Sequence, residues 1–160
     1  MTIKVGDKVP DAELRVMGEK GPMAIRAADL FKGKKVALFA LPGAFTPTCS
    51  AKHLPGFIQN ADAIKGKGFD SIVCLSVNDA FVMDAWGKAQ GAGDKVKMVA
   101  DGNGDFAKAL GLELDLRSKG LGVRSQRFSM IVSDGKVTRL NVEKDGAFEV
   151  SSAEALLKQA

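Results

Sequence analysis

The sequence predicts one α/β domain in which a central mixed sheet is flanked by helices and preceded by an N-terminal hairpin. Two runs, at 36–41 and 71–77, are continuous and apolar, which is typical of strands covered on both faces. Helical patterns follow both runs, and a hairpin signal at 133–135 precedes a final helical pattern. This succession of strands and helices is typical of an α/β domain.

The composition further limits which kinds of protein the chain can be. The chain has 160 residues and 16.9 kDa, which suits a single domain covering residues 1–160, and its hydrophobic content of 46% is ordinary for a globular protein. No apolar run approaches the ~20 residues that a membrane span needs. Residues 1–7 carry no signal-peptide pattern, so we expect a cytoplasmic location, with an earlier cleaved transit peptide as the alternative. The net charge of +4 is dispersed and aromatic residues make up 6%, so no nucleic-acid partner is expected.

The first third of the chain contains short elements. Alternating apolar residues at 12–16 and 22–26 predict a hairpin that turns at 18–21. Residues 27–30 are expected to form a short helical turn. The strand at 36–41 then leads into the first long helix.

That helix is predicted to begin close to Cys49, because residues 46–48 combine a threonine cap with a proline, which is well tolerated in the first turn. Pro55 should kink the helix, and Gly66 or Gly68 should end it. The apolar positions at near-helical spacing are Leu54, Phe57, Ile58, Ala61 and Ile64.

The middle of the chain repeats the pattern. The strand at 71–77 is followed by a cap at 78–79 and a helix at 80–90. A further strand is expected at 96–100 and a short helix at 104–110.

The last part begins with residues 112–126, which are polar and weakly periodic and are predicted to be a long ordered loop. Strands at 127–132 and 136–142 flank the turn at 133–135. Residues 151–154 fit a capping box that opens the final helix.

Cys49 is the residue with the clearest chemical potential. The first turn of a helix has unpaired N–H groups and the positive end of the helix dipole, so a thiol there is expected to be partly or mostly thiolate. The alternative is an inert buried thiol. With two cysteines, one histidine and no C-x-x-C, the chain has neither a disulfide framework nor a usual Cys/His zinc site.

Residues 42–49, with the sequence PGAFTPTC, resemble the active-site loop of the peroxiredoxins, which are thiol-dependent peroxidases on a thioredoxin-like fold. The similarity is greatest to the type-5 (type II, atypical) branch. It continues through residues 52–57, 76–79, 81–83, 85–87, 100–104, 111–116 and 122–128. The resemblance implies reduction of hydrogen peroxide and small organic hydroperoxides without metal, haem or flavin.

The resemblance also implies roles for individual residues. Cys49 is the peroxidatic nucleophile, Thr46 contacts the peroxide through its hydroxyl, Arg127 supplies a fixed charge to thiolate and peroxide, and Pro42 shields the sulfur. The residues expected to bind substrate are Gly43, Ala44, Phe45 and Thr48.

Arg127 is preferred to Arg117 and Arg124, because residues 127–130 (RFSM) match the family motif best. His53 follows Cys49 by one helical turn, and a Cys/His pair is also found in acyl-transfer hydrolases. No orienting Asn or Asp is evident, so we expect a structural role for His53 beside the reacting groups.

Regeneration is expected to need an external thiol. Cys74 lies in an apolar strand and is predicted to be buried and inert, and the C-terminal region around 148–152 lacks the resolving cysteine of other branch members. We therefore expect Cys49 to pass through sulfenic acid to a mixed disulfide with glutathione, which glutaredoxin then reduces. Thioredoxin is the alternative reductant, and a Cys49–Cys74 disulfide is the alternative route.

The resemblance further suggests a homodimer that uses loops near Phe45, Phe81 and residues 120–122. Two other functions stay open from the sequence. One is a non-enzymatic redox sensor that passes oxidation from Cys49 to a partner protein. The other is a thioredoxin-fold binding module with a structural cysteine.

Overall fold

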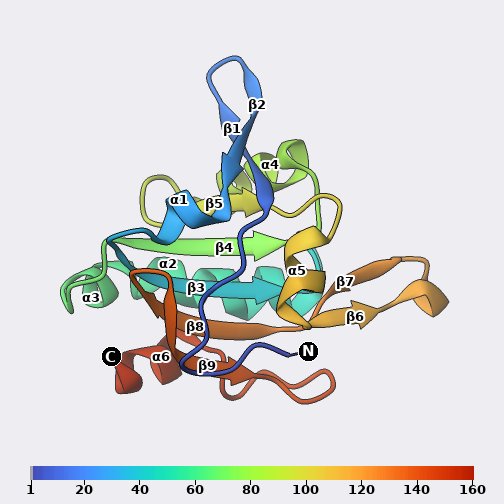
Figure 1. Cartoon of the computed structure of the whole chain (residues 1–160). Coiled ribbons are helices and arrows are strands. Elements are labelled where there is room, and N and C mark those ends of the chain that lie inside the picture. The colour runs from blue at the N-terminus through green and yellow to red at the C-terminus, as the bar shows by residue number, and fades with distance from the viewer. Residues whose placement is uncertain (1) are drawn as a thin grey trace.

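A computed structural model describes residues 2–160 and contains one large sheet and one small one. The strands of the large sheet are β1 (Glu13–Gly18), β2 (Gly21–Arg26), β3 (Lys35–Leu41), β4 (Ser71–Ser76), β5 (Lys97–Ala100), β8 (Phe128–Ser133) and β9 (Lys136–Val142). The helices are α1 (Ala27–Phe31), α2 (Leu54–Gln59), α3 (Ala61–Lys65), α4 (Ala80–Gln90), α5 (Asp105–Leu110) and α6 (Ala153–Gln159). The prediction of a central mixed sheet flanked by helices is confirmed (Figure 1).

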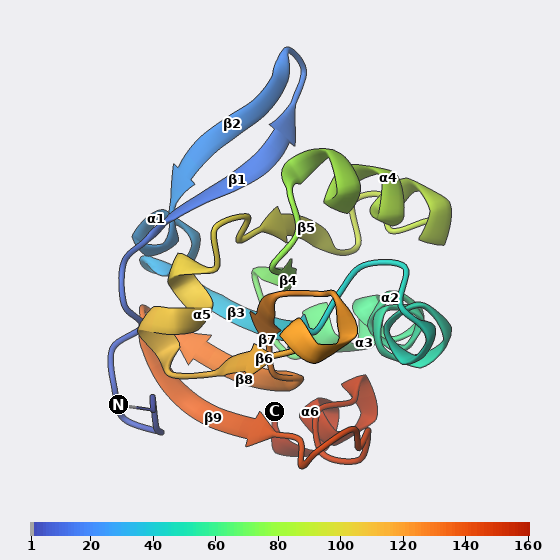
Figure 2. The ribbon, with the colours of Figure 1, turned by 90° about the vertical axis from the view of Figure 1, so that its right-hand side faces the viewer.

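The strand order is β2-β1-β5-β4-β3-β8-β9. Strands β3, β4 and β5 are parallel, whereas β8 runs antiparallel to β3 and β9 antiparallel to β8. The predicted N-terminal hairpin is formed by β1 and β2, and it joins the sheet through β5 (Arg15 opposite Ala100). Figures 1 and 2 show its tip projecting away from the sheet and its helices.

The sheet is buried on both faces, as the continuous apolar strands predict. Along β3, Ala37, Phe39 and Leu41 face α2, α3, α4 and α6, whereas the alternate residues face α1 and α5. Each face has its own apolar cluster, so the sheet is the middle layer of three. Among residues 2–160, no helix is long and apolar enough to cross a membrane.

Three local predictions are wrong. Residues 112–126 are not a loop but a small hairpin, β6 (Glu113–Asp115) and β7 (Val123–Ser125), with a 3-10 turn at Arg117–Lys119. Ser152, not Ser151, caps α6 by accepting a hydrogen bond from the N–H of Ala155 at 3.1 Å. The hydroxyl of Ser151 is bound elsewhere, as described below.

The long helix expected from Cys49 is also divided, into a π-helical turn (Cys49–His53), α2 and α3. The N–H of Leu54 bonds to the carbonyl of Cys49, five residues back. Pro55 follows directly, and a proline lacks an N–H and needs room beside the preceding turn, which a wider turn supplies. The predicted kink at Pro55 is therefore a change of helix type.

Candidate active site

Two hydrogen bonds hold the turn that follows β3. The N–H of Ala44 donates to Asn78 Oδ1 at 3.0 Å, and the hydroxyl of Thr46 donates to the Gly43 carbonyl at 2.6 Å. Phe45 has a positive φ of 64°, an uncommon conformation for an L residue, and these two hydrogen bonds lie on either side of it. The turn thus delivers residue 49 to a defined place at the end of β3.

Cys49 begins the π-helical turn and is only 1% exposed. Four residues later His53 is completely buried, on the same inner side of the chain. The spacing of four residues predicts an α-helical turn; the turn is wider, but the two side chains still come within reach of one common partner.

That partner is Arg127. Phe128, the first residue of β8, lies opposite Ala40 of β3, so Arg127 falls at the carboxyl end of β3, where the Cys49 turn begins. Its guanidinium donates from Nη2 to Cys49 Sγ at 3.1 Å and from Nη1 to His53 Nδ1 at 2.8 Å. The Phe148 ring lies 5.9 Å from the guanidinium carbon. A permanently charged group therefore touches the sulfur directly.

The protonation of His53 follows from its two partners. Arginine can only donate, so Nδ1 accepts, and the ring proton lies on Nε2, which donates to the Ser151 carbonyl at 2.9 Å. Burial, and next the charge of Arg127, lower the pKa of His53 to about 3. A neutral imidazole whose acceptor is already occupied cannot take a proton from Cys49, so the geometry does not support the hydrolase alternative.

Arg124, the weaker candidate from the sequence, also reaches the turn. Its Nη1 donates to the Pro42 carbonyl at 3.1 Å, and its Nε donates to the Leu121 carbonyl at 2.8 Å. A Cβ at Gly43 would lie 2.7 Å from the same guanidinium, so a larger residue there would displace the Arg124 side chain from this position. Arg124 thus supports the turn from outside, and Arg127 contacts the sulfur.

A cleft of about 430 Å³ opens beside these residues. The carboxyl ends of β3 and β4 lie on the same side of the molecule as the β6–β7 hairpin, and this side faces the viewer in Figure 2 (Figures 1 and 2). Leu114 and Leu116 give the cleft an apolar wall. Its other lining residues are Pro42, Thr46, Pro47, Thr48, Lys119, Gln126, Arg127, Glu143, Lys144, Asp145, Gly146 and Ala147.

The predicted site residues thus divide into two groups. The structure brings Pro42, Thr46, Thr48 and Arg127 to the cleft, whereas Cys49 does not line it but contacts Arg127, which does. Gly43, Ala44 and Phe45, expected to bind substrate, do not line the cleft: the N–H of Ala44 is already bound to Asn78, and the Phe45 side chain is 57% exposed. Within residues 2–160, no group of three or more His, Cys, Asp or Glu side chains could hold a metal ion.

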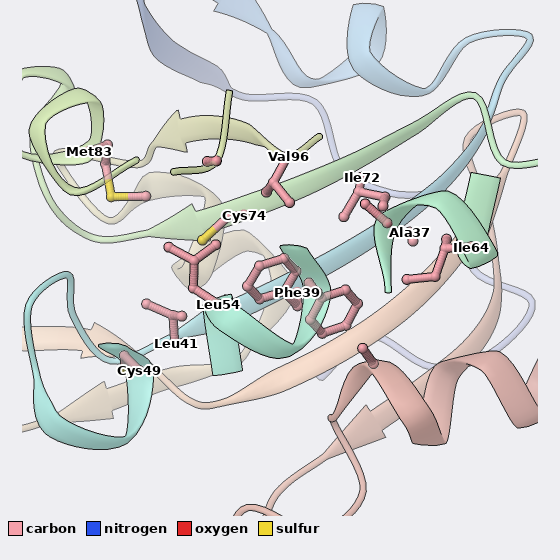
Figure 3. Close-up of a cluster of buried hydrophobic side chains, with 14 of the residues drawn as sticks. Ala37, Phe39, Leu41, Cys49, Leu54, Ile64, Ile72, Cys74, Met83 and Val96 are labelled. Atoms are coloured by element: carbon pink, nitrogen blue, oxygen red, sulfur yellow. The ribbon is translucent and has the colours of Figure 1, made fainter. Parts of the chain in front are cut away.

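Cys74 lies in the middle of β4, opposite Phe39, and is fully buried and unpaired. Burial, and next the charge of Cys49, raise the pKa of the Cys74 thiol well above its ordinary value. Figure 3 shows both cysteines in one apolar cluster, with Leu41 and Leu54 drawn between them in that view. These surroundings disfavour the thiolate that an attack on Cys49 would need.

Comparisons with known proteins agree on one family. The Redoxin family profile matches residues 4–157. The chain is 55% identical over 157 residues to Peroxiredoxin-2B of Arabidopsis thaliana, covering 98% of this chain and 97% of that protein. Among solved structures it resembles reduced Prx3 of Vibrio vulnificus in complex with H2O2 (52% identity, TM-score 0.95, 99% of each chain). It also resembles peroxiredoxin 5 of Alvinella pompejana (36% identity, TM-score 0.85, 98% of this chain and 96% of that one).

Proposed function

The chain belongs to the peroxiredoxins, which are thiol-dependent peroxidases, and we propose that it reduces hydrogen peroxide and small alkyl hydroperoxides through Cys49. The observation that carries the proposal is the Arg127 guanidinium, which donates to Cys49 Sγ at 3.1 Å beside an open cleft. The membership in an enzyme family sets aside the binding module with a structural cysteine.

In the proposed reaction the Cys49 thiolate attacks the terminal oxygen of the hydroperoxide. The S–O bond forms as the O–O bond breaks, the sulfur is oxidised to sulfenic acid, and the leaving oxygen departs as alkoxide or hydroxide and takes a proton from water. Arg127 stabilises the negative charge as it moves from sulfur to oxygen. The Thr46 hydroxyl, which donates to the Gly43 carbonyl at 2.6 Å, keeps its oxygen free to accept a hydrogen bond from the hydroperoxide.

Positioning accounts for most of the rate in this proposal. Lowering the pKa of any thiol from ~8.5 to ~6 raises its thiolate fraction at pH 7 roughly thirtyfold. The accompanying loss of nucleophilicity, with a Brønsted slope of ~0.4–0.5, removes about tenfold of that gain. The remaining few-fold is small beside the 10²–10³-fold that one well-placed donor can contribute.

We further propose a cycle with a single reacting cysteine. Cys74 is buried and unpaired, and the chain has no third cysteine that could resolve the sulfenic acid. A small thiol such as glutathione would release water from the sulfenic acid and form a mixed disulfide, and the glutaredoxin thiolate would take up the glutathione. Because Cys49 is 1% exposed, the π-helical turn must open for either reductant. Thioredoxin is the competing reductant.

The test compares peroxide consumption by wild type, Cys49→Ser and Cys74→Ser, first with dithiothreitol and then with glutathione plus glutaredoxin. The proposal expects loss of turnover only in Cys49→Ser. If Cys74→Ser also stops turnover, Cys74 resolves the sulfenic acid and the one-cysteine cycle is wrong. If wild type reacts once but never turns over with any thiol, the redox-sensor function is the better one.

We also propose that the chain belongs to the type-5 (type II) branch, forms a homodimer and is located in the cytoplasm. The likeness to Peroxiredoxin-2B and to peroxiredoxin 5 supports the branch, and two unpaired cysteines suit a reducing compartment. Exposed apolar side chains near the site support a dimer contact: Phe45, Phe81, Leu121 and Val123. Sedimentation velocity of wild type and Phe81→Asp tests it, since a dimer held through this face should dissociate in the variant.

A further inference from the structure

Glu143 is a buried acid whose role the peroxidase chemistry leaves unexplained. It follows the last residue of β9 and lines the cleft, yet it is only 9% exposed. A buried carboxylate is costly unless hydrogen bonds compensate for the lost water. Its partners therefore show what it does.

One oxygen of Glu143 accepts four hydrogen bonds. The N–H groups of Glu149, Val150 and Ser151 donate to Oε2 at 2.8, 2.9 and 2.8 Å, and the Ser151 hydroxyl donates at 2.6 Å. Three successive backbone donors directed at one oxygen fix the path of the chain from 149 to 151. They fix with it the direction of the Ser151 carbonyl.

That carbonyl accepts from His53 Nε2 at 2.9 Å, and His53 Nδ1 accepts from Arg127 Nη1 at 2.8 Å. The backbone N–H of Glu143 also donates to the Arg127 carbonyl at 2.9 Å. The contacts thus form a closed circuit. The backbone N–H of Glu143 bonds directly to the Arg127 carbonyl, and the Glu143 carboxylate is linked to the Arg127 guanidinium through Ser151 and His53.

We propose that Glu143 is a positioning residue for peroxide reduction, which fixes the Arg127 guanidinium against Cys49 by holding the Ser151 carbonyl on His53. Glu143 does not touch the sulfur. By holding the Ser151 carbonyl on Nε2 it adds a second constraint to the one that Arg127 places on the imidazole, and so keeps Nδ1 an acceptor for the arginine. When Nη1 is bound to His53, the planar guanidinium places its second nitrogen, Nη2, against Cys49 Sγ. The proposal rests on the peroxidase function proposed above.

The experiment uses Glu143→Ala, Glu143→Gln and the matched control Glu154→Gln. Glutamine keeps an oxygen for the three N–H donors but loses the charge, whereas alanine leaves them without an acceptor. Glu154 is an exposed acid at the start of α6, and among residues 2–160 its side chain has one hydrogen-bond partner, Asn60 at 3.4 Å, which is not part of the circuit. Thermal unfolding first establishes that each variant is folded.

Two readouts are measured for each folded variant. The first is kcat/KM for hydrogen peroxide, which should fall on the order of tenfold or more in Glu143→Ala, less in Glu143→Gln, and not at all in Glu154→Gln. The second is the ¹⁵N NMR spectrum of the imidazole, which needs no assignment because the chain has one histidine. Wild type should show the Nε2–H tautomer alone, and Glu143→Ala a mixture of both tautomers.

Each result decides the proposal. Slower peroxide reduction together with a mixed tautomer supports it. Unchanged kcat/KM in both Glu143 variants overturns it, and so does slow reduction with an unchanged imidazole spectrum, because Glu143 would then act without His53. If Glu143→Ala does not fold, Glu143→Gln is judged by the same two criteria. Wild type that fails to reduce peroxide contradicts the proposed function instead, while the imidazole spectra still test the circuit.

Discussion

The buried neutral His53 should make the stability of the fold depend on pH in the mildly acidic range. Its pKa is about 3 in the folded chain, against the ordinary 6.5 that the unfolded chain should show. Between these values the unfolded state binds one proton more than the native state, so the free energy of unfolding falls as pH falls. Stability is full above pH 6.5. From pH 7 to pH 5 the expected loss is about 2 kcal/mol.

Urea unfolding at pH 7 and pH 5, followed by the fluorescence of the single, buried Trp86, measures this loss. With an m-value of about 2 kcal/mol/M, the wild-type midpoint should move by roughly 1 M. His53→Gln cannot titrate, so it should be less stable at pH 7 but lose much less on acidification. The carboxylates are the same in both proteins and cancel in the comparison. Equal midpoint shifts in wild type and variant would refute the buried neutral imidazole.

Three substitutions test other parts of the structure. Arg127→Lys keeps the charge but replaces the planar fork, which contacts imidazole and sulfur through two separate nitrogens, with a single ammonium nitrogen, so kcat/KM for peroxide should fall about 10²-fold in a steady-state assay, with the exposed Arg117→Lys as an unchanged control. Thr46→Val removes a hydroxyl from the turn and should reduce kcat/KM on the order of tenfold, while the thermal midpoint reflects a loss of only about 1 kcal/mol. Phe57→Ala should destabilise the fold by about 3–5 kcal/mol in urea titrations, because the Phe57 ring is fully buried and stacks on Phe39 at 4.0 Å; a loss below about 1 kcal/mol would contradict that packing.

The parts of the fold that the sequence predicts well are those with strong, local signals. The apolar strands β3 and β4, the hairpin β1–β2 and the turn at Asp134, which has the positive φ of 47° that such a hairpin turn requires, all appear where expected. The β6–β7 hairpin was missed because each of its strands has three residues, too few for an alternation to be recognised. The π-helical turn was missed because a hydrogen bond to the fifth residue back leaves no mark on side-chain spacing.

The candidate site, too, is predictable from the sequence only where the signals are local. The segment around Cys49 is recognisable because its residues are adjacent in the chain, and Arg127 because it belongs to a second short motif. Nothing local indicates that Arg124 supports the Pro42 carbonyl, 82 residues away, or that Glu143 holds Ser151. These contacts depend on strand register and on which backbone groups remain unpaired at strand ends, and both are properties of the folded chain.

Register explains why the distant parts of the site meet at one point. Phe128 lies opposite both Ala40 of β3 and Val142 of β9, so the residues just outside these pairs, Arg127 and Glu143, lie at the same edge of the sheet. A slip of one residue in β8 would turn the Arg127 side chain to the other face, away from Cys49. The reactivity of the cysteine thus depends on the pairing of three strands as much as on the residues that surround it in the chain. Substitutions that weaken β8 or β9 should therefore be examined for their effect on peroxide reduction as well as on stability.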